Sequence, residues 1–155
     1  MGSHNVLPYC LMLIGEYTHT LDKKNRLSMP VKFRKEIGKK IVIAPWLDNC
    51  LALFTSKEWE KISNKLSESS MLQKDNRSFS RFMFGQAVTA ELDASGRILI
   101  PENLKNRSKL GSKVSVIGVQ NHAEIWNETA WREYKQKVEK EADALAGKLG
   151  EVGVL

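Results

Sequence analysis

The residues best suited to chemistry in this chain are an aspartate and an arginine four positions apart, and this pair occurs twice. The first pair lies in Asp22–Pro30 (DKKNRLSMP) and the second, 71 residues later, in Asp93–Pro101 (DASGRILIP). An aspartate that opens a turn can accept backbone N–H bonds and pair with the arginine, whose planar guanidinium can bind phosphate oxygens or guanine. A purely structural ion pair is the alternative, and the occurrence of two copies in basic segments favours a binding role.

These pairs are positioned by a tandem duplication. Beyond the prolines, Leu53-Phe54 matches Ile125-Trp126 and Trp59 matches Trp131, both at an offset of 72. Agreement at separated points indicates one unit used twice. We expect a first unit at 12–70, a linking helix at 71–84, and a second unit with a C-terminal helix at 85–149.

Each copy is expected to contain a strand, a turn, a second strand and the start of a helix. Asn25 and Gly96 occupy the same place in the two turns, and both residue types tolerate positive φ angles. Pro30 and Pro101 suit the first turn of a helix, where their missing N–H is not needed. The glycines predicted to end these helices are Gly38 and Gly111.

The later part of each copy predicts a hairpin followed by a helix. The expected strands are 41–43 with 51–54, and 114–119 with 123–126, because each pair consists of apolar runs separated by a polar turn. Thr55 and Glu58 form a capping box that predicts a helix. Asn127 is the predicted cap of a last helix that continues to about Lys148.

Positive charge is concentrated on the repeated unit. The net charge of the chain is +6, and residues 22–40 alone carry eight cations against two acids, which also gives +6. Residues 93–113 carry five cations against two acids, or +3. Clustered Lys and Arg suit a polyanion such as nucleic acid. The charge alone fits a solvated face equally well.

No pattern typical of a metal site, a cofactor site or a catalytic centre is present in the sequence. The cysteines and histidines are widely separated: Cys10, Cys50, His4, His19 and His122. Isolated cysteines favour a reducing compartment, so we expect a cytoplasmic protein. No nucleophile or paired carboxylate accompanies the possible acid–base groups, so we expect no enzyme and no small-molecule substrate.

Two further alternatives concern membranes and aromatic residues. No apolar run approaches the ~18 residues that a membrane span requires, so we expect no membrane partner. The tryptophans could stack on single-stranded bases, but Trp59 and Trp131 fall on apolar helix faces, which favours core packing. Met12 begins a segment that resembles a natural start, so residues 1–11 are left out of the fold prediction.

Several segments, taken with the two Asp–Arg loops, are specific enough to indicate a family. They are Gly15–Tyr17, Leu21–Pro30, Lys32–Arg34, Leu47–Leu51, Lys74–Phe79, Ala87-Val88, Glu91–Asp93, Gly96–Pro101 and Glu124–Trp126. Together they resemble the MraZ family of bacterial transcriptional regulators over about residues 12–134. One departure is Asn25, where the first loop of the family usually has glycine.

The resemblance implies an α+β fold of two tandem AbrB-like swapped-hairpin units that form a pseudo-symmetric β-barrel with peripheral helices. It also implies a ring-shaped homo-oligomer that binds double-stranded DNA at short direct repeats in the promoter of its own division and cell-wall gene cluster. The implied DNA contacts are Arg26, Arg97, Lys23, Lys24, Asn25 and Arg34, with Asp22 and Asp93 orienting the loops. Lys35 and Lys105 match further basic helix positions of the family.

The sequence therefore predicts a transcription regulator that binds DNA, needs no cofactor and associates with the nucleoid. The alternative from another class is a ring-forming scaffold whose loops bind an acidic protein partner. A small hydrolase is a third possibility, for which no catalytic constellation is found. Salt-sensitive, sequence-selective binding to promoter DNA would distinguish the first two.

Overall fold

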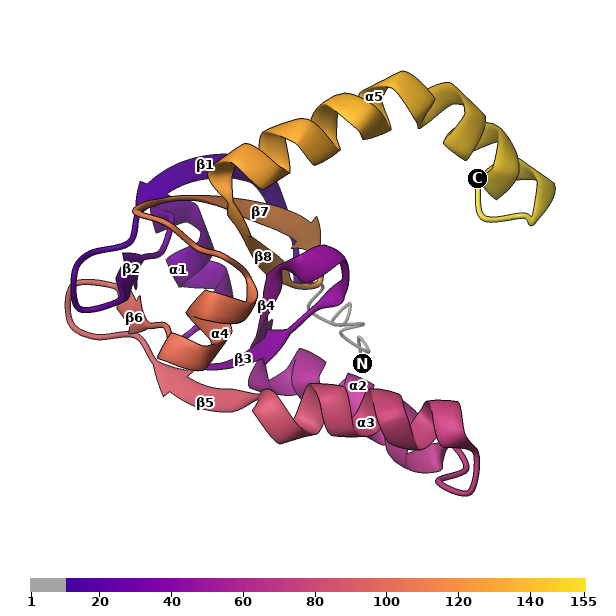
Figure 1. The fold of residues 1–155 in the computed structure, drawn as a ribbon, viewed down its shortest axis with the longest axis horizontal. Coiled ribbons are helices and arrows are strands. Elements are labelled where there is room, and N and C mark those ends of the chain that lie inside the picture. The colour runs from indigo at the N-terminus through magenta and orange to yellow at the C-terminus, as the bar shows by residue number, and fades with distance from the viewer. Residues whose placement is uncertain (1–10) are drawn as a thin grey trace, which may run out of the picture.

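The computed structural model describes residues 11–155, and the two copies of the repeat contribute the same succession of elements (Figure 1). The first copy contains β1 (Leu13–Thr20), β2 (Arg26–Ser28), α1 (Val31–Ile37), β3 (Lys40–Pro45), the 3-10 turn η1 (Leu47–Asn49), β4 (Leu51–Thr55) and α2 (Ser56–Glu68). After α3 (Lys74–Gln86), the second copy contains β5 (Val88–Glu91), β6 (Arg97–Leu99), α4 (Glu102–Arg107), β7 (Lys113–Gln120), β8 (Ala123–Asn127) and α5 (Glu128–Glu151).

The two copies share one six-stranded antiparallel sheet, in the order β1-β7-β8-β4-β3-β5. Exchanging each strand with its equivalent in the other copy reverses this order, so the sheet has approximate two-fold symmetry. The centre of that symmetry is the β4–β8 pair, where Ala52 lies opposite Glu124. Neither copy builds this sheet alone, because β1 pairs with β7 of the second copy and β5 pairs with β3 of the first.

A second pairing joins the copies through the short strands β2 and β6. Leu27 lies opposite Ile98 at the centre of this two-stranded ribbon, flanked by the pairs Arg26–Leu99 and Ser28–Arg97. The ribbon continues in two backbone bonds of matching geometry, from the Met29 N–H to the Gly96 carbonyl and from the Ile100 N–H to the Asn25 carbonyl. The ribbon therefore joins one strand from each copy.

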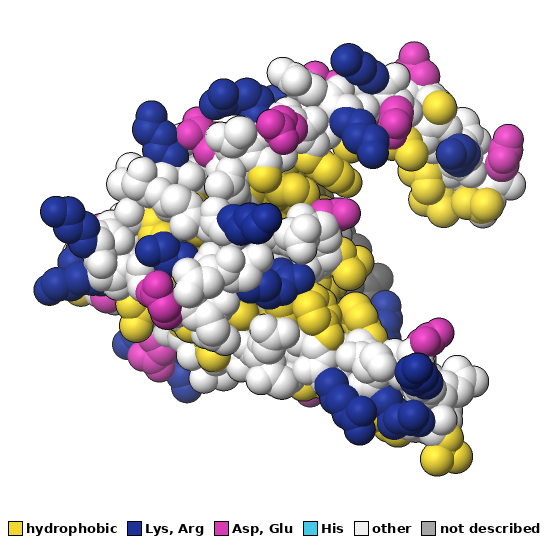
Figure 2. All heavy atoms as spheres, in the orientation of Figure 1, with side chains coloured by type: hydrophobic (Ala, Val, Ile, Leu, Met, Phe, Trp, Pro, Cys, Tyr) yellow, Lys and Arg dark blue, Asp and Glu magenta, His cyan; other side chains and the backbone are white. Residues whose placement is uncertain are grey.

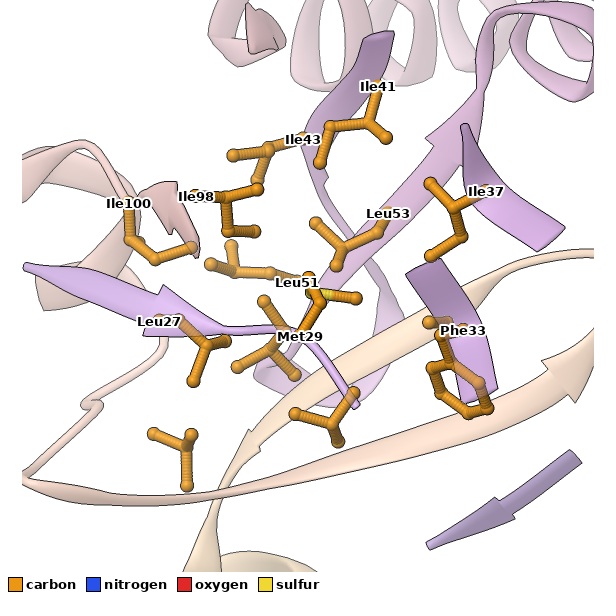
Figure 3. Close-up of a cluster of buried hydrophobic side chains, with 14 of the residues drawn as sticks. Leu27, Met29, Phe33, Ile37, Ile41, Ile43, Leu51, Leu53, Ile98 and Ile100 are labelled. Carbon is orange, nitrogen blue, oxygen red and sulfur yellow. The ribbon is translucent and has the colours of Figure 1, made fainter. Parts of the chain in front are cut away.

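The main core lies between the inner face of the large sheet, the β2–β6 ribbon and helix α1 (Figure 3). Alternation along the strands places Ile41, Ile43, Leu51 and Leu53 on this face, while Leu27 and Ile98 approach from the ribbon. Burial of these aliphatic side chains is the largest favourable term for the fold, at about 25 cal/mol per Å² of apolar surface removed from water.

The outer face of the sheet is covered by two helical arms, formed by α2 with α3 and by the start of α5 (Figure 1). Ala44, Ala52 and Phe54 pack against Met83 of α3, and Trp126 packs against Trp131 of α5. The predicted caps are present, because Thr55 Oγ1 accepts from the Glu58 N–H at 3.1 Å and Asn127 Oδ1 accepts from the Ala130 N–H at 3.0 Å. Both predicted hairpins, β3–β4 and β7–β8, are confirmed.

Several expectations need correction. Within residues 11–155 no pairing joins the edge strands β1 and β5, so the sheet is not closed into the expected barrel. The helix predicted to end at Gly111 ends at Arg107, because Lys109 itself takes the left-handed conformation, with φ 51°. Leu11, left out of the prediction, is buried in the main core at 6% exposure. The linking helix spans 74–86 rather than 71–84. Cys10 and His4 lie outside the described residues.

Candidate nucleic-acid interface

The first Asp–Arg loop connects β1 to β2 and is organised by one carboxylate. Asp22 Oδ1 accepts the backbone N–H groups of Lys24 and Arg26 at 2.8 and 2.9 Å, and Asp22 Oδ2 accepts Nε–H of Arg26 at 2.8 Å. The Asn25 N–H donates to the Asp22 carbonyl, which closes the turn, and Asn25 adopts φ 60°. The aspartate thus fixes both the backbone of the turn and the direction of the arginine.

The second loop, between β5 and β6, repeats this geometry atom for atom. Asp93 Oδ1 accepts the N–H groups of Ser95 and Arg97 at 2.9 Å, and Oδ2 accepts Nε–H of Arg97 at 2.9 Å. Gly96 takes the place of Asn25, with φ 76°. Two copies with different intervening residues keep the same bonds, so the Asp and Arg positions determine the loop structure.

Backbone N–H groups stabilise both carboxylates in their charged form. The Arg26 N–H bond lowers the pKa of Asp22, and the Arg97 N–H bond lowers the pKa of Asp93; the guanidinium bonds act in the same direction. Both aspartates are therefore ionised at neutral pH. Each aspartate bonds to its arginine through Nε alone. Among residues 11–155, no ion pair or hydrogen bond involves the Nη atoms of Arg26 or Arg97.

The β2–β6 ribbon brings the two arginines together. Leu27 and Ile98 point into the core with no exposure, so Arg26 and Arg97 project from the opposite, solvent-facing side. They occupy diagonal positions across an antiparallel pair, where neighbouring residues are roughly 7–8 Å apart. The side chains are 35% and 32% exposed, respectively. Both arginines therefore lie on one solvent-facing side of the ribbon, each bonded through Nε to the aspartate of its own loop.

Further cations flank the first loop. Lys23 and Lys24 are exposed at its tip, whereas the second loop has Ala94 and Ser95 at the equivalent positions. Lys and Arg side chains project from the end of the molecule where the two loops lie (Figures 1 and 2). The first loop is therefore the more basic of the two.

Arg34, predicted as a DNA contact, packs against the second loop. It lies half-buried at the end of α1, and its Nε–H donates to the Met29 carbonyl at 2.9 Å. Its guanidinium lies so close to Gly96 that a side chain at residue 96 would collide with it. With Lys39 and Asp93, Arg34 also lines a groove of about 720 Å³ beside this loop. Arg34 thus has a structural contact in the protein, and DNA contact by it stays a prediction.

Asn25 is held by residues of α4, which belong to the second copy. Its Nδ2 donates to Glu102 Oε2 at 2.6 Å, and its Oδ1 accepts from Lys105 Nζ at 3.0 Å. Sequence reasoning had not singled out Glu102, because a contact between residues 77 positions apart leaves no local signal. Lys35 is not brought to either loop; it lines a groove with Met12 and Ile14 between α1 and β1.

Other predicted features have definite positions. The thiol of Cys50 is buried and donates to the Leu47 carbonyl. His122 is buried against the Trp46 and Phe54 rings, which also contact each other, with Nε2 3.1 Å from Glu124 Oε2. In the part of the chain that the structure describes, no group of three or more His, Cys, Asp or Glu side chains could hold a metal ion. None of the described helices is long and apolar enough to cross a membrane.

Comparison with known proteins connects this geometry to a family. The family model described as "MraZ protein, putative antitoxin-like" matches residues 12–82 and again residues 83–148. The chain belongs to the MraZ family. The boundary between its two MraZ repeats falls within α3, and each repeat contains one Asp–Arg loop.

Curated MraZ relatives align over nearly their full length. A protein of Alkaliphilus oremlandii is 42% identical over 143 residues, which is 92% of this chain and 100% of the relative. A protein of Thermoanaerobacter sp. (strain X514) is 41% identical with the same coverage, and one of Moorella thermoacetica is 42% identical over 89% of this chain and 96% of its own length. Each of the three is named "Transcriptional regulator MraZ".

Proposed function

We propose that this protein is a transcriptional regulator that binds double-stranded DNA through its two Asp–Arg loops. The observation that carries the proposal is the placement of Arg26 and Arg97 on the same solvent-facing side of the β2–β6 ribbon, each held at Nε by an aspartate. The names of the MraZ relatives support the regulatory role.

The ribbon matches the chemistry of a major groove. That groove admits a two-stranded β-ribbon, and a guanidinium that presents its two Nη groups can bind guanine O6 and N7. Pre-positioning by Asp22 and Asp93 reduces the entropy lost when the arginines bind. Lys23 and Lys24 then contact phosphates, which adds affinity without sequence preference. The mechanism is selective binding, with no chemical turnover.

The proposal extends to assembly. Helix α5 extends away from the sheet, and hydrophobic side chains gather along the inner edge of this arm (Figures 1 and 2). Tyr134, Leu145 and Leu149 of α5 are 38–41% exposed, and their spacings of 11 and 4 residues place them on one face of the helix. A second copy of the chain would cover this surface, and a closed ring of copies would repeat the loops at regular intervals.

The target follows from that repetition. A ring matches direct repeats about 10 bp apart, so that successive protomers approach the same side of the duplex. We propose that these repeats lie in the promoter of the protein's own division and cell-wall gene cluster. The protein would then work in the cytoplasm on nucleoid DNA.

A titration by fluorescence anisotropy tests this function. DNA from upstream of the gene and a shuffled fragment of equal length are compared at several salt concentrations. We expect selective binding whose log K falls by about 0.9 per phosphate contact for each unit of log salt. Binding to acidic proteins with no preference for the promoter would instead support the scaffold alternative.

Single arginine variants refine the test. Arg26→Ala should weaken selective binding more than Arg97→Ala, because the first loop carries two additional lysines. A bidentate contact to a base is worth about 1–3 kcal/mol for each engaged protomer. Circular dichroism would verify that both variants fold. Wild-type selectivity in both variants would contradict the assignment of the loops.

A further inference from the structure

The two Asp–Arg loops have nearly identical backbones, but they are held in different ways. In the first loop, the Asn25 side chain bonds to Glu102 and Lys105 of α4. In the second loop the equivalent residue is Gly96, which has no side chain, and Arg34 packs directly against its backbone. The copies therefore agree in the turn and differ in what supports it.

The cations that support the two loops, Arg34 and Lys105, occupy equivalent positions in the two copies. Lys105 lies 71 positions after Arg34, at the offset that separates the two loops, so each helix supplies one cation to the loop of the other copy. Lys105 ends at the Asn25 amide oxygen, whereas the Nε–H of Arg34 donates to the Met29 carbonyl. Glu102 has no acidic equivalent, because the residue 71 positions earlier is Val31. Of the two described loops, only the first is bonded through a side chain to both an acidic and a basic residue of the opposite helix.

We propose that Glu102 and Lys105 are positioning residues for DNA recognition, which hold the first loop through the amide of Asn25. This inference rests on the proposed function of the loops. The bridge fixes residue 25, which lies directly before Arg26, to a helix that is anchored in the core by Leu104. Arg26 therefore enters the groove from a loop that is already ordered, and less entropy is lost on binding.

Asn25→Gly is the most informative variant. It keeps the net charge, and glycine adopts φ 60° without strain, as Gly96 does in the second loop at φ 76°. The variant removes both bonds of the bridge. The ratio of selective to non-selective DNA affinity should fall about two- to fivefold for each engaged loop, as expected for loss of partly exposed polar bonds.

A double-mutant cycle separates positioning from direct phosphate contact. Asn25→Gly removes both bonds of the bridge, whereas Lys105→Met removes one and leaves the Asn25–Glu102 bond in place. If Lys105 acts through Asn25, the double variant should lose no more selectivity than Asn25→Gly alone, and Lys105→Met should lose no more than either. Their salt dependence should match that of the wild type. Losses that multiply in the double variant, with a shallower salt slope after Lys105→Met, would show that Lys105 contacts phosphate and would overturn its positioning role.

Hydrogen exchange without DNA provides an independent readout with an internal control. The amides of Lys24, Asn25 and Arg26 are bonded within the first loop, and those of Ser95, Gly96 and Arg97 within the second. Asn25→Gly should speed exchange in the first loop only. Unchanged exchange there would overturn the inference, whether or not the protein binds DNA. A wild-type protein without selective DNA binding would instead overturn the proposed function.

Discussion

Arg34 of the first repeat lies against the backbone of Gly96 in the second, so closely that a β-carbon at residue 96 would collide with the guanidinium. Gly96 also adopts φ 76°, a conformation that disfavours residues with a β-carbon. The positive φ therefore favours glycine at this turn, and a β-carbon there would also displace the Arg34 side chain. The contact also shows that the second loop is completed by a helix of the other repeat.

Gly96→Ala should destabilise the protein and disturb the second loop. The left-handed conformation alone costs roughly 1–2 kcal/mol for a residue with a β-carbon, and displacement of Arg34 adds to that cost. Urea unfolding would measure the change. Gly96→Ala in an Arg34→Ala background is the matched control, because it keeps the cost of the positive φ and lacks the close contact. An equal loss of stability in the two backgrounds would contradict the close packing of Arg34.

Asp22 and Asp93 should stay ionised below the pH at which an ordinary aspartate takes up its proton. Because the pKa values of Asp22 and Asp93 are lowered in the folded protein, their contribution to stability is present above the unfolded-state pKa. It is lost only as the pH falls through the lowered folded values. Carbon-13 NMR titration of the two carboxyl groups measures this directly. Midpoints at or above those of an unfolded peptide would show that the N–H bonds are absent in solution.

Cys50 should be unreactive in the folded protein. Burial raises the pKa of its thiol well above the ordinary value, and Glu124 and Asp48 act in the same direction. Since the thiolate is the reactive form, alkylation of Cys50 by iodoacetamide at pH 8 should be slow until urea unfolds the chain. Peptide mapping by mass spectrometry would follow this cysteine separately from Cys10. Rapid modification under native conditions would indicate that the site opens readily.

Assembly should depend on the exposed face of α5. Replacing Leu145 and Leu149 together by glutamine keeps helix propensity and removes apolar surface. The oligomer of the variant should therefore dissociate at higher protein concentrations than that of the wild type. Sedimentation velocity over a concentration series gives the comparison. Leu47→Gln, at another exposed leucine outside α5, serves as the control. If the α5 variant and the control assemble alike, a different surface mediates association.

The repeated signature predicted the local structure well because its determinants are local. Asp22 and Asp93 bond to groups two to four residues away, so their spacing from the arginines was sufficient to predict the loops. Helix α1 is flanked by Pro30 at its start and Gly38 at its end, as expected. The end of α4 was predicted wrongly, because Lys109 adopts the left-handed conformation that was expected of Gly111.

Contacts between the repeats could not be read from the residues alone. The Asn25–Glu102 bond and the position of Arg34 over Gly96 join residues that are far apart in the sequence, so no spacing rule predicts them. The exchange of strands was implied by the family resemblance, and the pairing of β1 with β7 gives its register. The expected closure into a barrel failed because pairing ends at β1 and β5.

Recognition of guanine by Arg26 and Arg97 is tested most directly by replacing guanine with 7-deazaguanine, one base at a time, in the promoter repeats. This change removes the N7 acceptor and leaves base pairing intact. At contacted guanines the wild-type protein should lose part of the roughly 1–3 kcal/mol that a bidentate contact is worth, because the bond to N7 is lost and the bond to O6 remains. The Arg26→Ala variant should lose this sensitivity at one position in each repeat. Arg97→Ala should lose it at another. Equal wild-type affinity for every substituted DNA would contradict base recognition by these arginines.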